Sequence, residues 1–354
     1  MSPVSDNRWL HRFAVFTALA TLALICVGGL VTSHGVGMSV PDWPTTYGYN
    51  MFFFPFDQWV GGIFYEHTHR LVASAVGLFT VILAVWLTVK ESRAWLRRLG
   101  WIAVFAVVLQ GGLGGLRVTA LKDELGIFHA TLAQLFLVLM SVIALFTSRW
   151  WKRSEVSPMS TRERHLRVFY FVISGLILCQ LAIGATMRHQ HAGLAIPDFP
   201  AAYGKLWPDM DTDSVARYNQ ARGEVTALNP ITAFQIGLHM VHRITAVIIL
   251  AGVIWAAWFT GRRVGWSSTL GRLSIGWLVL IFIQAALGMA TIWTNKSADI
   301  ATVHVAVGAL SLVTGAGLGL MAGRRMISVS RLAKISDAAA ARVEVASRPA
   351  QSVA

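Results

Sequence analysis

Four histidines lie inside long apolar segments of this chain and form two matched pairs. The first pair is His69 and His129, and the second is His242 and His304. An imidazole is costly to hold in a hydrocarbon layer, so four of them at a similar depth indicate metal ligation. Two axial histidine pairs across a helical bundle would hold two b-type hemes. The simpler alternative is that each histidine only makes a hydrogen bond between helices, and zinc is disfavoured because no further ligands cluster at that depth.

Arginines directly follow one ligand candidate in each half of the chain. Arg70 comes after His69, and Arg243 comes after His242. A buried guanidinium needs an anion, and a heme propionate offers a carboxylate that suits its fork geometry. The alternative is that both arginines reach to lipid headgroups. Further outward cations that could meet a propionate are Arg117, Lys122 and Lys296.

Near the ligand candidates, the two halves differ at one position that bears on their chemistry. Glu66 lies three residues before His69, on the same helical face, whereas His239 holds the matching place before His242. A carboxylate one turn from an axial ligand can accept a proton or stabilise a cation, so we expect Glu66 to be catalytic and the first half to carry the chemistry. An interfacial carboxylate paired with a cation or water is the alternative. His239 is also an alternative ligand to His242, which we prefer because it aligns with His69 and precedes an arginine.

The elements that must position these residues are transmembrane helices. The 354 residues are 55% hydrophobic and 13% charged, with a mean hydropathy of +0.58, whereas soluble domains carry about 25% charged residues. We therefore expect an all-α integral membrane protein with eight transmembrane helices. The apolar segments fall near 12–33, 68–89, 99–117, 125–148, 166–187, 235–260, 272–293 and 300–322.

The distribution of Lys and Arg predicts the orientation. Of the 30 such residues, 21 fall on the side that holds both termini and seven on the opposite side. This bias predicts cytoplasmic N- and C-termini in a multi-pass protein of the cell inner (plasma) membrane. The net charge of +13 then reflects contact with anionic membrane lipid, and it gives no reason to expect a nucleic acid partner.

The chain contains an internal duplication. Segments 35–44 and 191–200 share a Pro-Asp-aromatic-Pro motif, and a Tyr-Gly pair follows each of them. Because each repeat holds four helices, an even number, we expect two parallel-repeat four-helix bundles. The predicted units are an N-terminal half at 1–155 with a substrate heme site and a C-terminal half at 156–325 with a heme b cofactor site. We expect residues 326–354 to form a disordered cytoplasmic tail.

This set of motifs resembles the heme A synthase family over residues 12–322. The residues that carry the resemblance are Glu66, His69, Arg70, His129, His242, Arg243, His304 and the two Pro-Asp-aromatic-Pro loops. The resemblance implies an oxidoreductase that converts the C8 methyl of heme O to the formyl group of heme A, for cytochrome oxidase, with oxygen derived from water. It also implies a substrate heme O between His69 and His129 and a resident heme b between His242 and His304.

Some members of that family carry cysteine pairs in their outward loops, and this chain has none. Its two cysteines, Cys26 and Cys179, lie within predicted helices, so we expect no disulfide role. The family also implies heme O synthase and cytochrome oxidase assembly factors as partners. The electron acceptor and the order of the oxidation steps stay open, as does a homo-oligomer.

Two other functions are compatible with parts of this pattern. The main alternative is a diheme b-type membrane electron carrier that exchanges electrons with quinone and leaves the porphyrin unchanged. A transporter built from parallel repeats would bind no pigment. The single Asp209-Met-Asp-Thr-Asp213 run is a weak match to a magnesium–diphosphate motif and does not favour a prenyltransferase.

Overall fold

The computed structural model describes residues 7–156, 161–222, 230–322 and 324–326. Within these ranges, eight helices are long and apolar enough to cross a membrane, so the prediction of an all-α multi-pass membrane fold is confirmed. They are α1 (Arg8–Ser33), α2 (Gly61–Lys90), α3 (Ala94–Ala120), α4 (Asp123–Thr147), α6 (Thr161–His189), α8 (Ala233–Val264), α9 (Thr269–Trp293) and α10 (Ala298–Met321).

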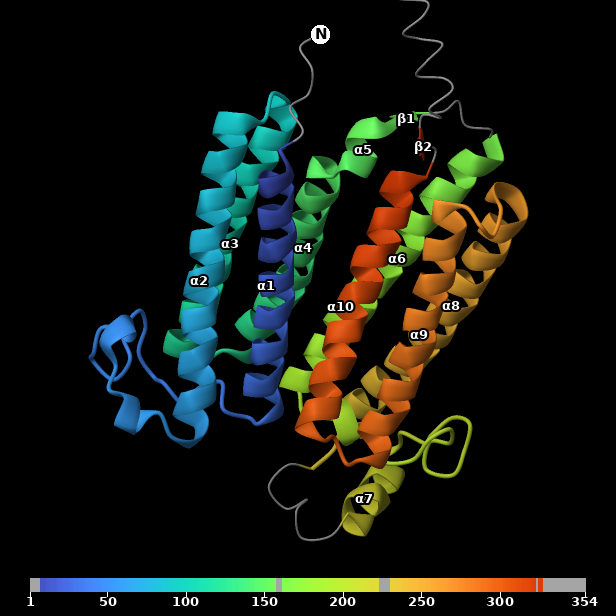
Figure 1. The fold of residues 1–354 in the computed structure, drawn as a ribbon. Coiled ribbons are helices and arrows are strands. Elements are labelled where there is room, and N and C mark those ends of the chain that lie inside the picture. Colours follow the sequence, from blue (N-terminus) through green and yellow to red (C-terminus); the bar gives the residue numbers. More distant parts are fainter. Residues whose placement is uncertain (1–6, 157–160, 223–229, 323, 327–354) are drawn as a thin grey trace, which may run out of the picture.

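The spanning helices form two groups of four that stand side by side (Figure 1). One group contains α1 to α4, and the other contains α6, α8, α9 and α10. The groups meet where α1 packs on α10, α6 packs on α4, and α4 packs on α10. The first helix of each group thus packs on the fourth helix of the other, which is the arrangement expected of two parallel repeats.

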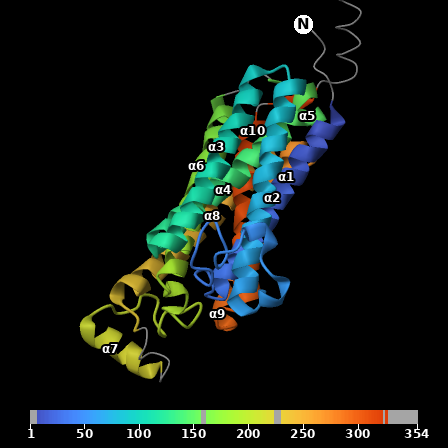
Figure 2. The same cartoon turned by 90° about the vertical axis from the view of Figure 1, so that its left-hand side faces the viewer.

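The described chain enters α1 and leaves α10 at the same end of the molecule, and the short helix α7 (Thr212–Ala221) lies at the opposite end (Figures 1 and 2). The two long connections, 34–60 and 190–232, share the end where α7 lies. They contain the 3-10 turns η1 (Met51–Phe53), η2 (Phe56–Gln58) and η3 (Ala192–Leu194). We call this the loop end of the molecule.

At the other end, a short link joins the halves through α5 (Arg149–Arg153) and β1 (Ser154–Val156). β1 pairs antiparallel with β2 (Arg324–Met326), so a small two-stranded ladder is added to the expected helices. Arg324 donates hydrogen bonds to the carbonyls of Trp151 and Ser154. Residues 327–354 of the predicted disordered tail lie outside the described residues.

Each half has its own apolar core near the end opposite the loops. In the first half this core includes Leu10, Leu83 and Met140, and in the second half it includes Tyr170 and Trp277. Buried polar atoms require hydrogen-bond partners, and in the second-half core the Tyr170 hydroxyl bonds to the hydroxyls of Thr260 and Ser274. Along α2 and α8, the ligand candidates His69 and His242 lie nearer the loop end than these cores, and a third apolar cluster that includes Met187, Ile196 and Ile236 packs beneath the second loop.

One helix boundary differs from the prediction in a way that matters for the site. Hydropathy places the start of the second helix near residue 68, but α2 begins at Gly61. The extra turns contain Glu66 and His67, both buried. Hydropathy does not predict these turns because Glu66 and His67 are polar, although the preceding loop contacts both of them.

Candidate functional site

The structure brings together the histidines of each predicted pair. His69 on α2 and His129 on α4 have ring centres 6.5 Å apart, with ring planes at 84°. His242 on α8 and His304 on α10 have the same separation of 6.5 Å, with planes at 57°. Each pair therefore joins the second and fourth helices of its half across the bundle.

The separation within each pair is suited to one metal ion between two imidazoles. A ligating nitrogen lies about 2 Å from the metal and about 1.2 Å from its ring centre, so two opposed rings have centres about 6.4 Å apart. In the described residues there is no group of three or more His, Cys, Asp or Glu side chains that could hold a metal ion. The donor set in each half is thus two opposed imidazoles, which fits axial ligation of a heme iron.

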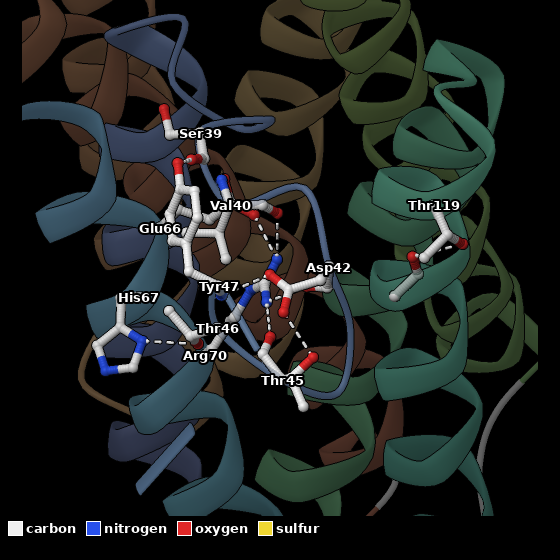
Figure 3. A network of polar contacts seen from close by, with 11 residues as sticks. Ser39, Val40, Asp42, Thr45, Thr46, Tyr47, Glu66, His67, Arg70 and Thr119 are labelled. Atoms are coloured by element: carbon white, nitrogen blue, oxygen red, sulfur yellow. Dashed lines mark hydrogen bonds and ion pairs between the residues drawn. The ribbon is translucent and has the colours of Figure 1, made fainter. Parts of the chain in front are cut away.

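In the first half, a carboxylate and an arginine fix the first long loop, residues 34–60, onto α2 (Figure 3). Glu66 accepts a hydrogen bond from the backbone N–H of Val40 at 3.0 Å and pairs with Arg70 at 2.8 Å. Arg70 also donates to the carbonyls of Val40, Asp42 and Thr45. The guanidinium therefore acts as a clamp that satisfies three loop carbonyls and one buried carboxylate.

The clamped loop is organised internally by Asp42 (Figure 3). Its carboxylate accepts hydrogen bonds from the backbone N–H groups of Tyr47 and Gly48 and from the Thr45 hydroxyl. Burial alone would raise the pKa of Asp42, but these donors outweigh it and hold the pKa below its usual value. A charged aspartate at this position keeps the turn closed at neutral pH.

The second half repeats this construction. Arg243 donates to the carbonyls of Asp198 at 2.6 Å and Ala201 at 2.8 Å. The backbone N–H of Ile196 donates to Nδ1 of His239 at 3.3 Å. The side chain of Asp198 accepts hydrogen bonds from two backbone N–H groups that follow it, as Asp42 does. His239 thus takes over the loop contact of Glu66, although it supplies no carboxylate.

The Pro-Asp-aromatic-Pro motifs place one aromatic side chain against each site. A β-carbon at Gly115 of α3 would overlap the Trp43 indole, so Trp43 lies directly against that helix. The preceding residue, Gly114, lies against the ring of His129, since a β-carbon there would be 3.3 Å from Cε1 of that ring. Phe199 lies under the Arg243 guanidinium, at 5.4 Å from its ring centre.

Two further histidines near the loop end are buried. His67 is fully buried; its Nδ1 lies 3.2 Å from the Thr46 hydroxyl, and its ring packs against Trp59 and Phe54. His189, at the end of α6, is 9% exposed and lies against Gly126 of α4. Their positions depend on loop and interhelical packing, which hydropathy does not report.

The remaining sequence candidates have varied surroundings. Arg117 lies against Gly37 of the first loop, and Lys122 is exposed. Burial lowers the pKa of Lys296, with a smaller effect from the positive charge of Arg188. In the acidic run, Asp211 caps α7 by accepting from the N–H of Ser214, so a structural role accounts for it.

Fold and site together define a multi-pass membrane protein whose two similar halves each hold a facing imidazole pair under a clamped loop. The chain belongs to the COX15-CtaA family of cytochrome oxidase assembly proteins, whose model matches residues 49–316.

Curated relatives extend this similarity over most of the chain. Heme A synthase of Shouchella clausii is 25% identical over 297 residues, which cover 82% of this chain and 89% of that protein. Heme A synthase of Nitrosomonas eutropha is 26% identical over 328 residues, covering 83% and 88% respectively. Heme A synthase of Shewanella oneidensis is 24% identical over 345 residues, covering 92% and 99%.

Proposed function

We propose that the chain is a heme A synthase, an oxidoreductase that converts the C8 methyl group of heme O to a formyl group. The observation that carries this proposal is the pair of facing imidazole sites within a member of the cytochrome oxidase assembly family. The names of its curated relatives support the same reaction. The reaction adds one oxygen atom from water and releases electrons and protons, so a membrane electron acceptor is required.

We assign the substrate heme O to His69 and His129, and a resident heme b to His242 and His304. The two halves, 1–155 and 156–325, then act as a reaction unit and an electron-transfer unit. Bound heme iron supplies the redox chemistry, and two imidazoles on one iron favour electron transfer over oxygen binding. The chain's own contribution is to hold each heme at a fixed depth and to exclude the bulk solvent.

Glu66 is our candidate for the catalytic carboxylate. It is 4% exposed and lies one helical turn from His69. Its position supports a role as proton acceptor or cation stabiliser, since His239 replaces it in the half to which we assign no chemistry. Its bonds to Val40 and Arg70 hold it in place.

Arg70 and Arg243 are our propionate-binding candidates. The Nε atom of Arg243 is buried and has no hydrogen-bond partner among the described residues, which supports an additional acceptor at that position. Arg70 already uses both terminal nitrogens on the loop and Glu66. A propionate would therefore meet its Nε atom or displace a loop carbonyl.

One observation favours the diheme electron carrier as a second candidate. Glu66 and His239 make the same bond to equivalent loop N–H groups, so the carboxylate has a structural use as well as a proposed chemical one. A carrier that exchanges electrons with quinone would need only that structural use.

The proposed setting follows from the family. Heme O synthase would supply the substrate, and cytochrome oxidase assembly factors would receive the product. We place the protein in the cell inner (plasma) membrane with cytoplasmic termini, so that the loop end faces outward.

Expression in a host that makes heme O, followed by purification and pigment extraction, tests the function. We expect low-spin heme absorption and extracted heme A or its hydroxylated intermediate. Pigment that consists of heme b and unaltered heme O would instead support the electron carrier, and a colourless protein would exclude both. The control is the His69→Ala variant, which should retain the second-half heme but form no product.

A further inference from the structure

We propose that glycines opposite the four iron-ligating imidazoles set the orientation of those rings, and that the three in tight contact, Gly28, Gly114 and Gly288, are positioning residues, whereas Gly184 leaves its ring room to move. This inference rests on the proposed heme ligation and deepens it. Each glycine lies on a neighbouring helix opposite one histidine. The pairs are Gly28 on α1 with His69, Gly114 on α3 with His129, Gly184 on α6 with His242, and Gly288 on α9 with His304.

The contacts are close enough to control ring position. A β-carbon at Gly28 would lie 3.0 Å from Cε1 of its histidine, and β-carbons at Gly114 and Gly288 would lie 3.3 Å from theirs. At Gly184 the distance would be 3.6 Å. Because carbon atoms in contact rest about 3.5–4.0 Å apart, alanine at 28 must displace the ring most, and alanine at 184 need not displace it.

The contact falls on the edge of the ring that carries its nitrogens. Cε1 lies between Nδ1 and Nε2, and a β-carbon at Gly28 would also approach Nδ1 of His69 at 3.4 Å and Nε2 at 3.7 Å. A methyl group there turns the ring and moves the nitrogen that binds iron. The Nδ1 atoms of all four histidines are buried without a hydrogen-bond partner. Ligating histidines donate their second N–H to carbonyls or water, and a glycine leaves the opposing backbone open to that nitrogen.

The duplication supports a specific role for these glycines. Both glycine pairs recur at matching places in the two halves, each opposite its ligand. Other glycines on the same helices face open space: a β-carbon at Gly112, Gly175 or Gly276 would meet nothing within 4 Å. Close contact with a histidine is therefore not a general property of glycines on these helices. Gly112, Gly175 and Gly276 provide matched controls on α3, α6 and α9.

Single glycine-to-alanine variants of the full chain, purified with bound heme, test the inference. The readouts are heme content, the low-spin electron paramagnetic resonance signal and the midpoint potential of each heme. We expect Gly28→Ala to lose most of the low-spin signal of the first-half heme and Gly288→Ala to shift that of the second-half heme. Gly184→Ala and the controls Gly112→Ala, Gly175→Ala and Gly276→Ala should match the unmodified protein.

A graded response that follows the four distances supports the inference. If the spectra of Gly28→Ala and Gly288→Ala match those of the controls, the inference about the glycines is overturned. The proposed function would still stand in that case, provided that the unmodified protein contains two low-spin hemes. Absence of heme from the unmodified protein would overturn both. If Gly28→Ala does not accumulate, the Gly28→Ala/His69→Gly double variant is used with added imidazole. Restored low-spin heme supports a positioning role, because a free ring can avoid the methyl group; no restoration contradicts it.

Discussion

Replacing Glu66 by histidine separates its structural role from its proposed chemical role. The second half already has a histidine, His239, at the matching position, where it accepts the equivalent loop N–H. The buried Glu66–Arg70 pair is 2.8 Å long, with side chains 5% and 9% exposed. Removing one partner of such a pair costs about 3–5 kcal/mol, and Glu66→Ala also leaves the N–H of Val40 without its acceptor. We expect the low end of that range, because Arg70 retains three carbonyl acceptors. Glu66→Ala should therefore lose both heat stability and product.

Glu66→His should behave differently. His239 accepts the N–H of Ile196, so a histidine at 66 should accept the N–H of Val40 in the same way. The remaining cost is one charged hydrogen bond to Arg70, about 1.5–3 kcal/mol. We expect Glu66→His to keep its low-spin heme on heating to nearly the usual temperature but to form heme A at least about 100-fold more slowly, the lower end of the effect of a general base.

The assay follows low-spin absorption during heating and measures the ratio of heme A to heme O after extraction. The matched control is His239→Glu, which places a carboxylate four residues before Arg243, the spacing of Glu66 and Arg70. We expect this variant to be stable and active. Product formation within a few-fold of normal in Glu66→His would refute a chemical role that only a carboxylate can fill, because histidine can also accept a proton. Loss of heme and stability in both exchange variants would refute the structural equivalence of the two positions.

Three further outcomes can be measured. The His242→Ala variant should lose one low-spin heme per chain and retain the other, as counted by pyridine hemochrome; loss of both would contradict independent sites. In Arg243→Lys, a lysine cannot span the carbonyls of Asp198 and Ala201 as a fork, and the loss of one charged hydrogen bond, about 1.5–3 kcal/mol, should speed proteolysis of the loop at least tenfold; an unchanged rate would argue against the clamp. Burial raises the pKa of Tyr203 from 10.0 to about 12, so its stabilising contribution is complete below pH 10 and is lost as the pH rises towards 12. The absorbance titration at alkaline pH should show this late tyrosine and should lose it in Tyr203→Phe.

The sequence predicts the eight helices and the pairing of the histidines because both depend on patterns within the chain. Apolar length identifies the spans, and the duplication aligns His69 with His242. The sequence pattern does not predict the arginine clamps, because Arg70 donates to backbone carbonyls 25–30 residues earlier and Arg243 to carbonyls 42–45 residues earlier. Every residue has a carbonyl, so the acceptors cannot be recognised from residue types. A usable signal was nevertheless present: the His-Arg pair and the Pro-Asp-aromatic-Pro loop are duplicated together, which is expected if they contact each other.

The two halves share most features of their candidate sites and differ in a few. The clamps, the aspartate-centred turns and the facing imidazoles occur in both halves, so these features explain how heme would be held but not why only one heme would react. The first half differs in having Glu66, and in having His67 packed among aromatic rings where the second half has Met240. The ring of His67 packs against Phe54 and Trp59, and its Nδ1 lies 3.2 Å from the Thr46 hydroxyl, so this histidine is occupied by the loop. Glu66 lies one helical turn from His69 on the same face of α2, whereas His67, two residues from His69, lies on another face. On this ground Glu66 is the better candidate for the proton acceptor.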